Sequence, residues 1–255
     1  SSVNDAVAEI KKSSEAKYLA GGMTLIPTLK ARLSSADMLV DLKGANLSNV
    51  SVSSSEVVIG SMTRHCDVAS SSEVLSSLPA LAKLAGGIGD HMVRSCGTIG
   101  GSLANNDPAA CYPSAVLALD ATIITNERTI GAEDFFLGMF ETALNENEII
   151  TEVKFPIPEK ASYIKFPNPA SRYAMVGVFI AKKATGVAVA VTGAGENGVF
   201  RCSEIENALN SSFNVGSIDN VEISPDGLNN DIHASGSYRA NLIKEMAKRA
   251  LNEMI

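Results

Sequence analysis

Two glycine pairs are the residues whose type and spacing best suit the binding of a phosphate-bearing ligand. The first pair, Gly21-Gly22, ends a short apolar stretch and is followed by Met23, Thr24 and a helical pattern. A strand that turns directly into a helix aims unpaired backbone N–H groups and the positive end of a helix dipole at one point, where an anion is stabilised. Glycine lets a pyrophosphate approach the backbone, and Thr24 adds a hydroxyl donor. The alternative interpretation is a plain strand-to-helix turn.

The second pair, Gly100-Gly101, lies between Thr98-Ile99 and Ser102 in a stretch with almost no charge. The flanking hydroxyl groups are suited to hydrogen-bond a phosphate or the edge of a cofactor ring. One such loop is weak support for a ligand. Two of them, in a chain with no recognisable nucleophile–base pair and no metal-ligand cluster, indicate a large bound nucleotide cofactor rather than a self-contained hydrolytic site.

A third glycine motif has the letters of a dinucleotide-binding loop but the wrong context. Gly193, Gly195 and Gly198 match the pattern GxGxxG. That motif needs a helix that begins at the third glycine and an acidic residue at the end of a following strand. Here residues 199–202 resemble a returning strand, so we predict a hairpin turn.

The composition predicts a soluble globular protein. The chain has 255 residues, of which 45% are hydrophobic, enough for one large or two to three small packed units. The formal net charge of −7 argues against nucleic-acid binding, which requires a basic surface. No apolar run approaches the roughly 20 residues of a transmembrane helix, and the first residues lack the features of a signal peptide. A cytoplasmic location is therefore expected.

The cysteines and histidines form no pattern typical of a metal site. The chain has four widely separated cysteines, Cys66, Cys96, Cys111 and Cys202, and no CxxC motif. This spacing predicts neither a zinc site nor an iron–sulfur site, and buried free thiols are expected instead. His65 and His91 are expected to be structural hydrogen-bonding residues rather than bases.

The elements that must position the first glycine pair form a short helix–strand alternation. Helices are predicted over residues 5–14 and 23–33, and strands over residues 17–20 and 37–42. Pro27 lies near the start of the second helix, where its missing N–H does no harm. Two strands joined by a helix predict a small βαβ unit.

Beyond residue 50 the pattern changes to short segments separated by turn residues. Strands are predicted over residues 55–62, 98–106, 117–125 and 148–158, with one helix over residues 77–88. Three prolines between Phe155 and Pro167 mark the best candidate for a domain junction.

The C-terminal part is predicted to combine a sheet with a long helix. Residues 173–202 have the pattern of antiparallel hairpins, with turns at Thr185-Gly186 and at Glu196-Asn197-Gly198. The last predicted helix covers residues 237–255. One face of this helix is apolar and consists of Leu242, Ile243, Met246, Ala250 and Met254.

Two long segments resemble the signatures of a known family, the FAD subunits of molybdenum hydroxylases. These segments are YLAGGMTLIPTLKARL, which begins at Tyr18, and RSCGTIGGSLANNDPAACYPSAVLALDA, which begins at Arg94. Shorter matches are IGSMTRHCDV, DFFLGMFETALNENEIITEVKFP and SGSYRANLIKEMAKRAL. The family includes carbon monoxide dehydrogenase medium subunits and the flavin domain of xanthine dehydrogenase. The resemblance covers nearly the whole chain.

The resemblance implies an α+β protein with the two-lobed FAD-binding fold of the FAD-linked oxidase type and a further C-terminal lobe. Residues 1–50 form an N-terminal α/β lobe, and residues 51–157 form a middle, mixed α/β lobe. Residues 160–255 form a lobe with a three-stranded antiparallel sheet and helices. FAD is expected between the first two lobes.

The resemblance also implies which residues contact FAD. The pyrophosphate is expected against Tyr18, Leu19, Ala20, Gly21, Gly22, Met23, Thr24 and Leu25. The second lobe is expected to contribute Thr98, Ile99, Gly100, Gly101 and Ser102. Ile88, Ile150 and Lys165 lie at positions of further contacts, although a solvated surface lysine is the alternative for Lys165. Asp107 is expected either to hydrogen-bond the ribitol or ribose or to cap a helix before Pro108.

Two further positions near the cofactor leave alternatives open. Tyr173 either covers the flavin ring or is an ordinary aromatic residue at a strand end. Cys111 stands where relatives carry an acidic residue, so a carboxylate contact to the cofactor is missing. Either a water molecule or Asp107 replaces that contact, or FAD is held less tightly.

The function implied by the resemblance is electron transfer, in which no protein residue is catalytic and the flavin carries the chemistry. Electrons would come from molybdenum on a large molybdopterin-binding subunit through 2Fe-2S clusters on a small subunit. The electrons would then pass from the flavin to an external acceptor, which is NAD, a quinone, ferredoxin or oxygen. The implied assembly is a hetero-oligomer, compatible with a dimer of heterotrimers.

Two other functions are weighed against it. A free-standing FAD-dependent oxidase or reductase would need its own substrate pocket and proton donor. A nucleotide-binding assembly module would be a non-catalytic protein that no longer binds FAD because of changes such as Cys111.

Overall fold

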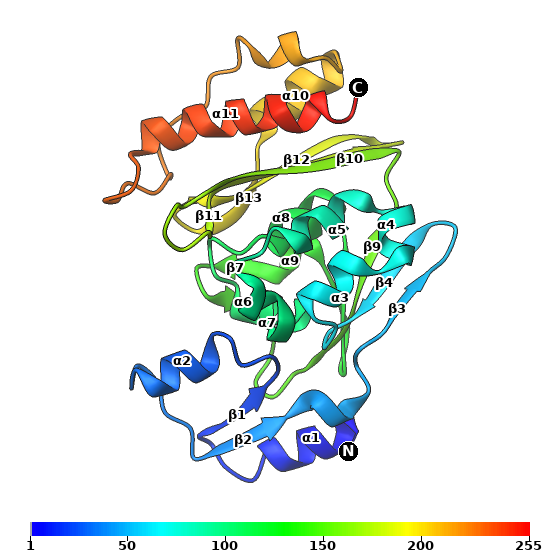
Figure 1. Ribbon diagram of the computed structural model, residues 1–255, viewed down its shortest axis with the longest axis vertical. Coiled ribbons are helices and arrows are strands. Elements are labelled where there is room, and N and C mark those ends of the chain that lie inside the picture. Colours follow the sequence, from blue (N-terminus) through cyan, green and yellow to red (C-terminus); the bar gives the residue numbers. More distant parts are fainter. Residues whose placement is uncertain (1) are drawn as a thin grey trace.

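The computed structural model describes residues 2–255. Figure 1 shows three parts stacked along the longest axis, with the N-terminal elements at one end and the last helix at the other. No helix in the described chain is both long enough and apolar enough to cross a membrane.

The N-terminal lobe is the expected βαβ unit, preceded by one helix. Its elements are α1 (Val3–Ile10), β1 (Ala16–Leu19), α2 (Leu25–Lys30), β2 (Met38–Asp41) and the short 3-10 helix η1 (Leu42–Ala45). The strands β1 and β2 pair in parallel, which confirms the predicted unit. Its small core contains Ala6, Ile10, Val40 and Leu42 and is completed by Ile149 from the middle lobe.

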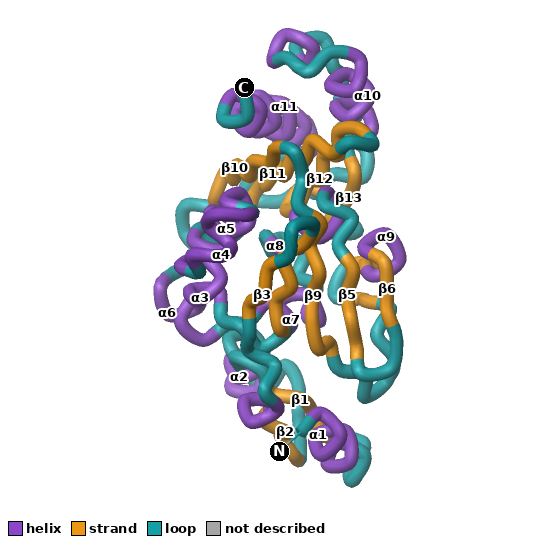
Figure 2. Tube along the Cα trace, turned by 90° about the vertical axis from the view of Figure 1, so that its right-hand side faces the viewer, coloured by secondary structure: helices purple, strands orange, loops and turns teal. Residues whose placement is uncertain are grey.

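The middle lobe is built on a five-stranded antiparallel sheet, whose strands lie side by side in Figure 2. The strand order is β3 (Val50–Val52), β4 (Glu56–Gly60), β9 (Ile150–Pro156), β5 (Thr122–Thr125) and β6 (Thr129–Gly131). The helices are α3 (His65–Ser70), α4 (Ser72–Ser77), α5 (Pro79–Gly86), α6 (His91–Cys96), α7 (Ile99–Asn105), α8 (Tyr112–Ala118) and α9 (Ala132–Phe135). A short hairpin, β7 (Phe136–Gly138) and β8 (Glu141–Thr142), completes the lobe.

The predicted strand over residues 98–106 is wrong, because this segment forms the helix α7. The Thr98 hydroxyl oxygen accepts a hydrogen bond from the Gly101 N–H at 3.1 Å. Threonine in this N-cap position satisfies one of the free N–H groups of a first helical turn. The local cap therefore outweighs the low helix propensity of two adjacent glycines.

The C-terminal lobe has a four-stranded antiparallel sheet, not the three strands expected. The order is β10 (Lys160–Pro167), β11 (Ala174–Lys183), β12 (Gly186–Gly195) and β13 (Gly198–Arg201). Of the three prolines that indicated a junction, Pro156 ends β9 and Pro167 ends β10, where a missing N–H breaks no central ladder, and Pro158 lies between these two strands. Both predicted hairpin turns are confirmed, and the GxGxxG motif spans the second of them, with Gly193 and Gly195 in β12 and Gly198 in β13.

Both faces of this sheet are covered, which explains why nearly every residue of β11 and β12 is buried. On one face Phe179 and Ala190 extend the core of the middle lobe. On the other face Val178 and Val189 pack in the core formed with α10 (Ser203–Ser211), the 3-10 helix η2 (Val215–Ile218) and α11 (Gly236–Asn252). The predicted apolar face of the last helix is buried there, as expected. Because the middle-lobe core continues onto the sheet, the division at residues 50 and 157 stays a prediction.

Candidate functional site

A single cavity of about 630 Å³ is lined by residues of all three lobes. This volume is within the roughly 300–1,000 Å³ of typical cofactor pockets. The residues expected to contact a cofactor all line it, with Leu19 and Ile99 as the exceptions among residues 2–255. Ile99 instead lies fully buried in the middle-lobe core. The cavity thus brings together the two glycine pairs and Lys165, which are far apart in the sequence.

The first glycine pair presents a row of free hydrogen-bond donors to this cavity. Gly22 has φ +70°, a left-handed conformation that favours glycine. Within the described chain, the backbone N–H groups of Gly22, Met23 and Thr24 have no acceptor. The Thr24 hydroxyl, at the N-cap of α2, makes no capping hydrogen bond. Consecutive free N–H groups of this kind form a concave site for an anion.

Gly21 is required for the contact between the N-terminal and middle lobes. A Cβ atom at Gly21 would lie 2.1 Å from the carbonyl oxygen of Cys96 and 2.8 Å from the Cα of Gly97. Both atoms belong to backbone, which cannot turn aside as a side chain can. The missing side chain therefore lets the first glycine loop lie directly on the loop that precedes α7.

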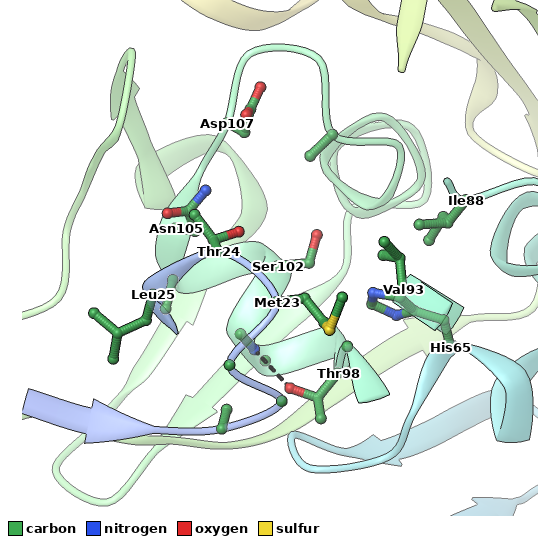
Figure 3. A pocket seen from close by; sticks show the side chains of 18 of the residues that line it. Met23, Thr24, Leu25, His65, Ile88, Val93, Thr98, Ser102, Asn105 and Asp107 are labelled. Carbon is green, nitrogen blue, oxygen red and sulfur yellow. Dashed lines mark hydrogen bonds between the residues drawn. The ribbon is translucent and has the colours of Figure 1, made fainter. Parts of the chain in front are cut away.

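The second glycine pair allows close packing, and its backbone N–H groups already donate hydrogen bonds within the protein. The Gly100 N–H donates to the Ser61 carbonyl oxygen at 2.8 Å, and the Gly101 N–H donates to Thr98. A Cβ at Gly100 would lie 2.5 Å from the Cβ of Ser61. The free donors on this wall are instead the hydroxyl of Ser102 and the amide of Asn105, neither of which bonds to another described residue. Figure 3 shows both side chains near Thr24.

Lys165 is held inside the site and is not the solvated surface lysine of the alternative interpretation. Its Nζ donates to the carbonyl oxygens of Gly87 at 2.5 Å and Arg172 at 3.1 Å, and to Cys111 Sγ at 3.7 Å. An ammonium group has three N–H donors, so all three are used. The partners are neutral, and the bond to sulfur is the weakest, so a cofactor acceptor would displace it first.

Asp107 and Tyr173 lie at the same end of the cavity. Asp107 Oδ1 accepts a hydrogen bond from the Ala109 N–H at 2.8 Å, which fixes the loop before α8. Its other carboxylate oxygen makes no bond to the described residues. Tyr173 is 47% exposed and immediately precedes β11, so it lies both at a strand end and at the rim. Burial, with Asp107 and Cys111 nearby, raises the pKa of Tyr173.

The end of the cavity near Ile150 is held by buried hydrogen bonds. The Tyr18 hydroxyl donates to the Asn147 carbonyl oxygen at 3.0 Å, and burial, with Glu127 nearby, raises the pKa of Tyr18 to about 12. Burial raises the pKa of Glu148, but hydrogen bonds from Arg128, from a backbone N–H and from a threonine outweigh it and lower that pKa overall. The Glu148 side chain is fully buried and lies 3.1 Å from Arg128 Nε.

The cysteine and histidine expectations are met only in part. Cys111 and Cys202 are buried free thiols as expected, but Cys66 is half-buried and Cys96 is exposed. His91 is structural as expected, with its Nδ1 2.9 Å from the Ser95 hydroxyl.

Several other lining residues could not be predicted from the sequence, because they carry no local signal. Met62, Val93 and Leu144 face the cavity from three separate segments. Asn105 had a usable signal, since it lies between the second glycine pair and the DPAA motif, and the lining residues Ala109 and Ala110 belong to that motif itself. Contacts that depend on long-range packing leave no trace in local spacing.

The comparisons with known proteins agree with one another. The family model for the FAD binding domain in molybdopterin dehydrogenase matches residues 1–158. The chain is 33% identical to the glyceraldehyde dehydrogenase medium chain of Sulfolobus acidocaldarius, a match that covers 99% of this chain and 95% of the relative. It is 31% identical to the carbon monoxide dehydrogenase medium chain of Hydrogenophaga pseudoflava, with 98% and 93% covered.

The fold is similar to that of a solved carbon monoxide dehydrogenase chain from Hydrogenophaga pseudoflava. The TM-score is 0.85 at 32% sequence identity, and the match covers 98% of this chain and 93% of the other. The matched family segment ends before Lys165 and Tyr173, so part of the cavity wall lies beyond it.

Proposed function

Because the chain belongs to the family of FAD-binding domains of molybdopterin dehydrogenases, we propose that it is the electron-transfer subunit of a multi-subunit molybdenum hydroxylase. In this proposal the subunit holds FAD between the 2Fe-2S clusters of a small partner subunit and an external acceptor. Substrate is oxidised on a large molybdopterin-binding partner subunit. FAD, when bound, supplies the electron-transfer chemistry.

The observation that carries this proposal is the row of free N–H groups from Gly22 to Thr24. It faces a second wall with free polar groups at Ser102 and Asn105, in a cavity large enough for a dinucleotide. A pyrophosphate has the acceptors that these donors lack, so the residues present fit FAD. Gly21 holds this loop against the middle lobe.

The chain's own residues would also orient and shield the ring end. Ile88 and Val93 give this end an apolar wall suited to a flat ring, and Lys165 adds a positive charge from the C-terminal lobe. Tyr173 at the rim limits access of water. Exclusion of water strengthens the electrostatic effect of a nearby charge.

The partners and acceptor extend this proposal beyond the chain itself. The relatives named as medium chains belong to enzymes with different names, glyceraldehyde dehydrogenase and carbon monoxide dehydrogenase among them. The substrate is thus expected to be set by the large subunit. We place the assembly, a hetero-oligomer of three kinds of subunit, in the cytoplasm.

Co-purification tests the proposed function directly. The tagged chain is isolated from its native cell, and the product is examined by absorption spectroscopy, metal analysis and protein identification. We expect a flavin absorption band, iron, molybdenum and two further polypeptides. A lone yellow protein that oxidises a substrate unaided would contradict the proposal in favour of a free-standing flavoenzyme, and a colourless protein that takes up no FAD would indicate an assembly module.

A further inference from the structure

The segment of residues 143–149 connects the middle lobe to the N-terminal lobe beside the cavity. It joins β8 to β9 and belongs to the middle lobe. The Tyr18 hydroxyl of β1 donates to its Asn147 carbonyl oxygen at 3.0 Å. Its last residue, Ile149, is 3% exposed and lies in the core of the N-terminal lobe. We call this segment the clasp, because it holds the N-terminal lobe at both of these points.

The clasp is also a wall of the cavity. The cavity is lined there by Leu144 and Ile149, together with Ile150 at the start of β9. These apolar side chains are separate from Ile88 and Val93, the wall suited to the flavin. FAD carries two flat ring systems, one on each side of its pyrophosphate. With the flavin against one wall and the pyrophosphate at the first glycine pair, the clasp is left to receive the adenine.

A buried carboxylate determines the shape of the clasp. The Glu148 side chain has no exposed surface, and both of its oxygens are paired. Its Oε1 accepts hydrogen bonds from the Thr125 hydroxyl at 2.6 Å and from Arg128 Nε at 3.1 Å. Its Oε2 accepts from the Asn145 N–H at 2.6 Å and from Arg128 Nη2 at 3.1 Å. The carboxylate thus ties the clasp to the turn between β5 and β6, where Thr125 and Arg128 lie.

Arg128 is the cationic partner of this carboxylate. Its Nη2 also donates to the Ala143 carbonyl oxygen, at the start of the clasp. A buried carboxylate that loses its cation is strongly disfavoured, and a planar guanidinium can bond both carboxylate oxygens at once. The Arg128 side chain is 43% exposed and is not among the described residues that line the cavity. Arg128 therefore reaches the cavity only through the clasp.

We propose that Arg128 and Glu148 are positioning residues that fix the clasp at the adenine end and so make the site selective for FAD over FMN. The inference rests on the proposed function, since FAD is the occupant it requires. FMN has the flavin and one phosphate but no adenine, so FMN makes no use of the clasp wall. A loosened clasp therefore weakens the binding of FAD and leaves the binding of FMN unchanged.

The test compares the affinities of the whole chain for the two flavins. The apoprotein of the unaltered chain and that of Arg128→Ala are titrated with FAD and, separately, with FMN, and flavin fluorescence is recorded. Each side chain that must be ordered on binding weakens affinity by up to about tenfold. The Kd for FAD is therefore expected to rise about tenfold in Arg128→Ala, and the Kd for FMN is expected to stay the same.

Two further variants separate positioning from general stability. Arg128→Lys keeps the charge but lacks the planar fork that bonds both carboxylate oxygens. Its Kd for FAD is expected to lie between those of the unaltered chain and Arg128→Ala. Arg201→Ala loses an ion pair with Glu206 in the C-terminal lobe, outside the cavity lining of the described chain. This control is expected to lower the urea midpoint of unfolding and to leave both Kd values unchanged.

The visible circular dichroism of bound FAD reports on the flavin end separately. At saturating FAD, Arg128→Ala is expected to give the spectrum of the unaltered chain, because the clasp contacts the adenine and not the flavin. This spectrum also decides the question if FMN binds too weakly to be titrated.

An unchanged Kd for FAD in Arg128→Ala, an equal rise for FAD and FMN, or an altered flavin spectrum would overturn the inference while leaving the proposed function intact. If Arg128→Ala does not fold, Arg128→Lys decides by the same measurements. Failure of the unaltered chain to bind FAD would overturn both proposals.

Discussion

The substitution Gly21→Ala tests whether the contact between the glycine loop and the middle lobe is needed for cofactor binding. The added Cβ would lie 2.1 Å from the Cys96 carbonyl oxygen, far inside normal contact distance. The loop must shift, and such overpacking costs about 1–3 kcal/mol. The shifted loop must return to the middle lobe to present its N–H groups to FAD, so most of this cost should fall on the bound state. We therefore expect the Kd for FAD to rise roughly 5- to 150-fold.

The assay is a fluorescence titration of the purified apoprotein with FAD, accompanied by urea unfolding. The matched control is Gly86→Ala in α5, where the new Cβ would meet only Ala69 at 3.7 Å, an ordinary contact. That control should bind FAD normally and be slightly more stable, because alanine favours helix by about 1 kcal/mol over glycine. A Gly21→Ala protein that binds FAD as tightly as the unaltered chain would refute the reasoning.

Three further predictions follow from the charges of the site. In Cys111→Asp the new carboxylate should pair with Lys165 and so weaken the positive charge beside the flavin. The flavin midpoint potential should then fall by about 30 mV or more, which is a tenfold change in the equilibrium constant of a two-electron couple. The control Cys111→Ser should show no such fall when both potentials are measured by dye titration. Because the pKa of His65 is lower in the folded protein than the usual 6.5, the unfolded chain binds more protons. The free energy of unfolding of the apoprotein should therefore fall by up to about 3 kcal/mol between pH 6.5 and 4, and urea unfolding of His65→Phe should not show this loss. Arg128→Ala leaves the buried Glu148 carboxylate without its guanidinium partner and should lower the urea midpoint of unfolding relative to the unaltered chain.

The sequence predicts those parts of the fold that depend on local spacing. The βαβ unit, both hairpin turns and the apolar face of α11 follow from patterns within about twenty residues of each other. The helix α7 could not be predicted from propensity, because its two glycines disfavour helix and only the Thr98 cap reveals its start. The fourth strand was hidden by Pro167, whose place at a strand end depends on the pairing partner.

The candidate site, like the fold, combines residues that local patterns predict with residues that only long-range packing brings together. The glycine pairs are visible as motifs, and the resemblance adds positions such as Ile88 and Lys165. No spacing rule shows that Lys165 bonds to Cys111, since 54 residues separate them. The cavity position of His65 is equally non-local, because it depends on the packing of α3 against Gly97.

The C-terminal lobe reaches the cavity from a separate stretch of the polypeptide. The donors suited to a pyrophosphate come from the N-terminal and middle lobes, whereas Lys165 and Tyr173 enter from the C-terminal lobe. Under the proposed function, the C-terminal lobe would thus add a charge and an aromatic group to a ring end that the middle lobe also lines. Exchange of the C-terminal lobe between relatives would be a way to retune the flavin for a new acceptor while the grip on its phosphates stays the same.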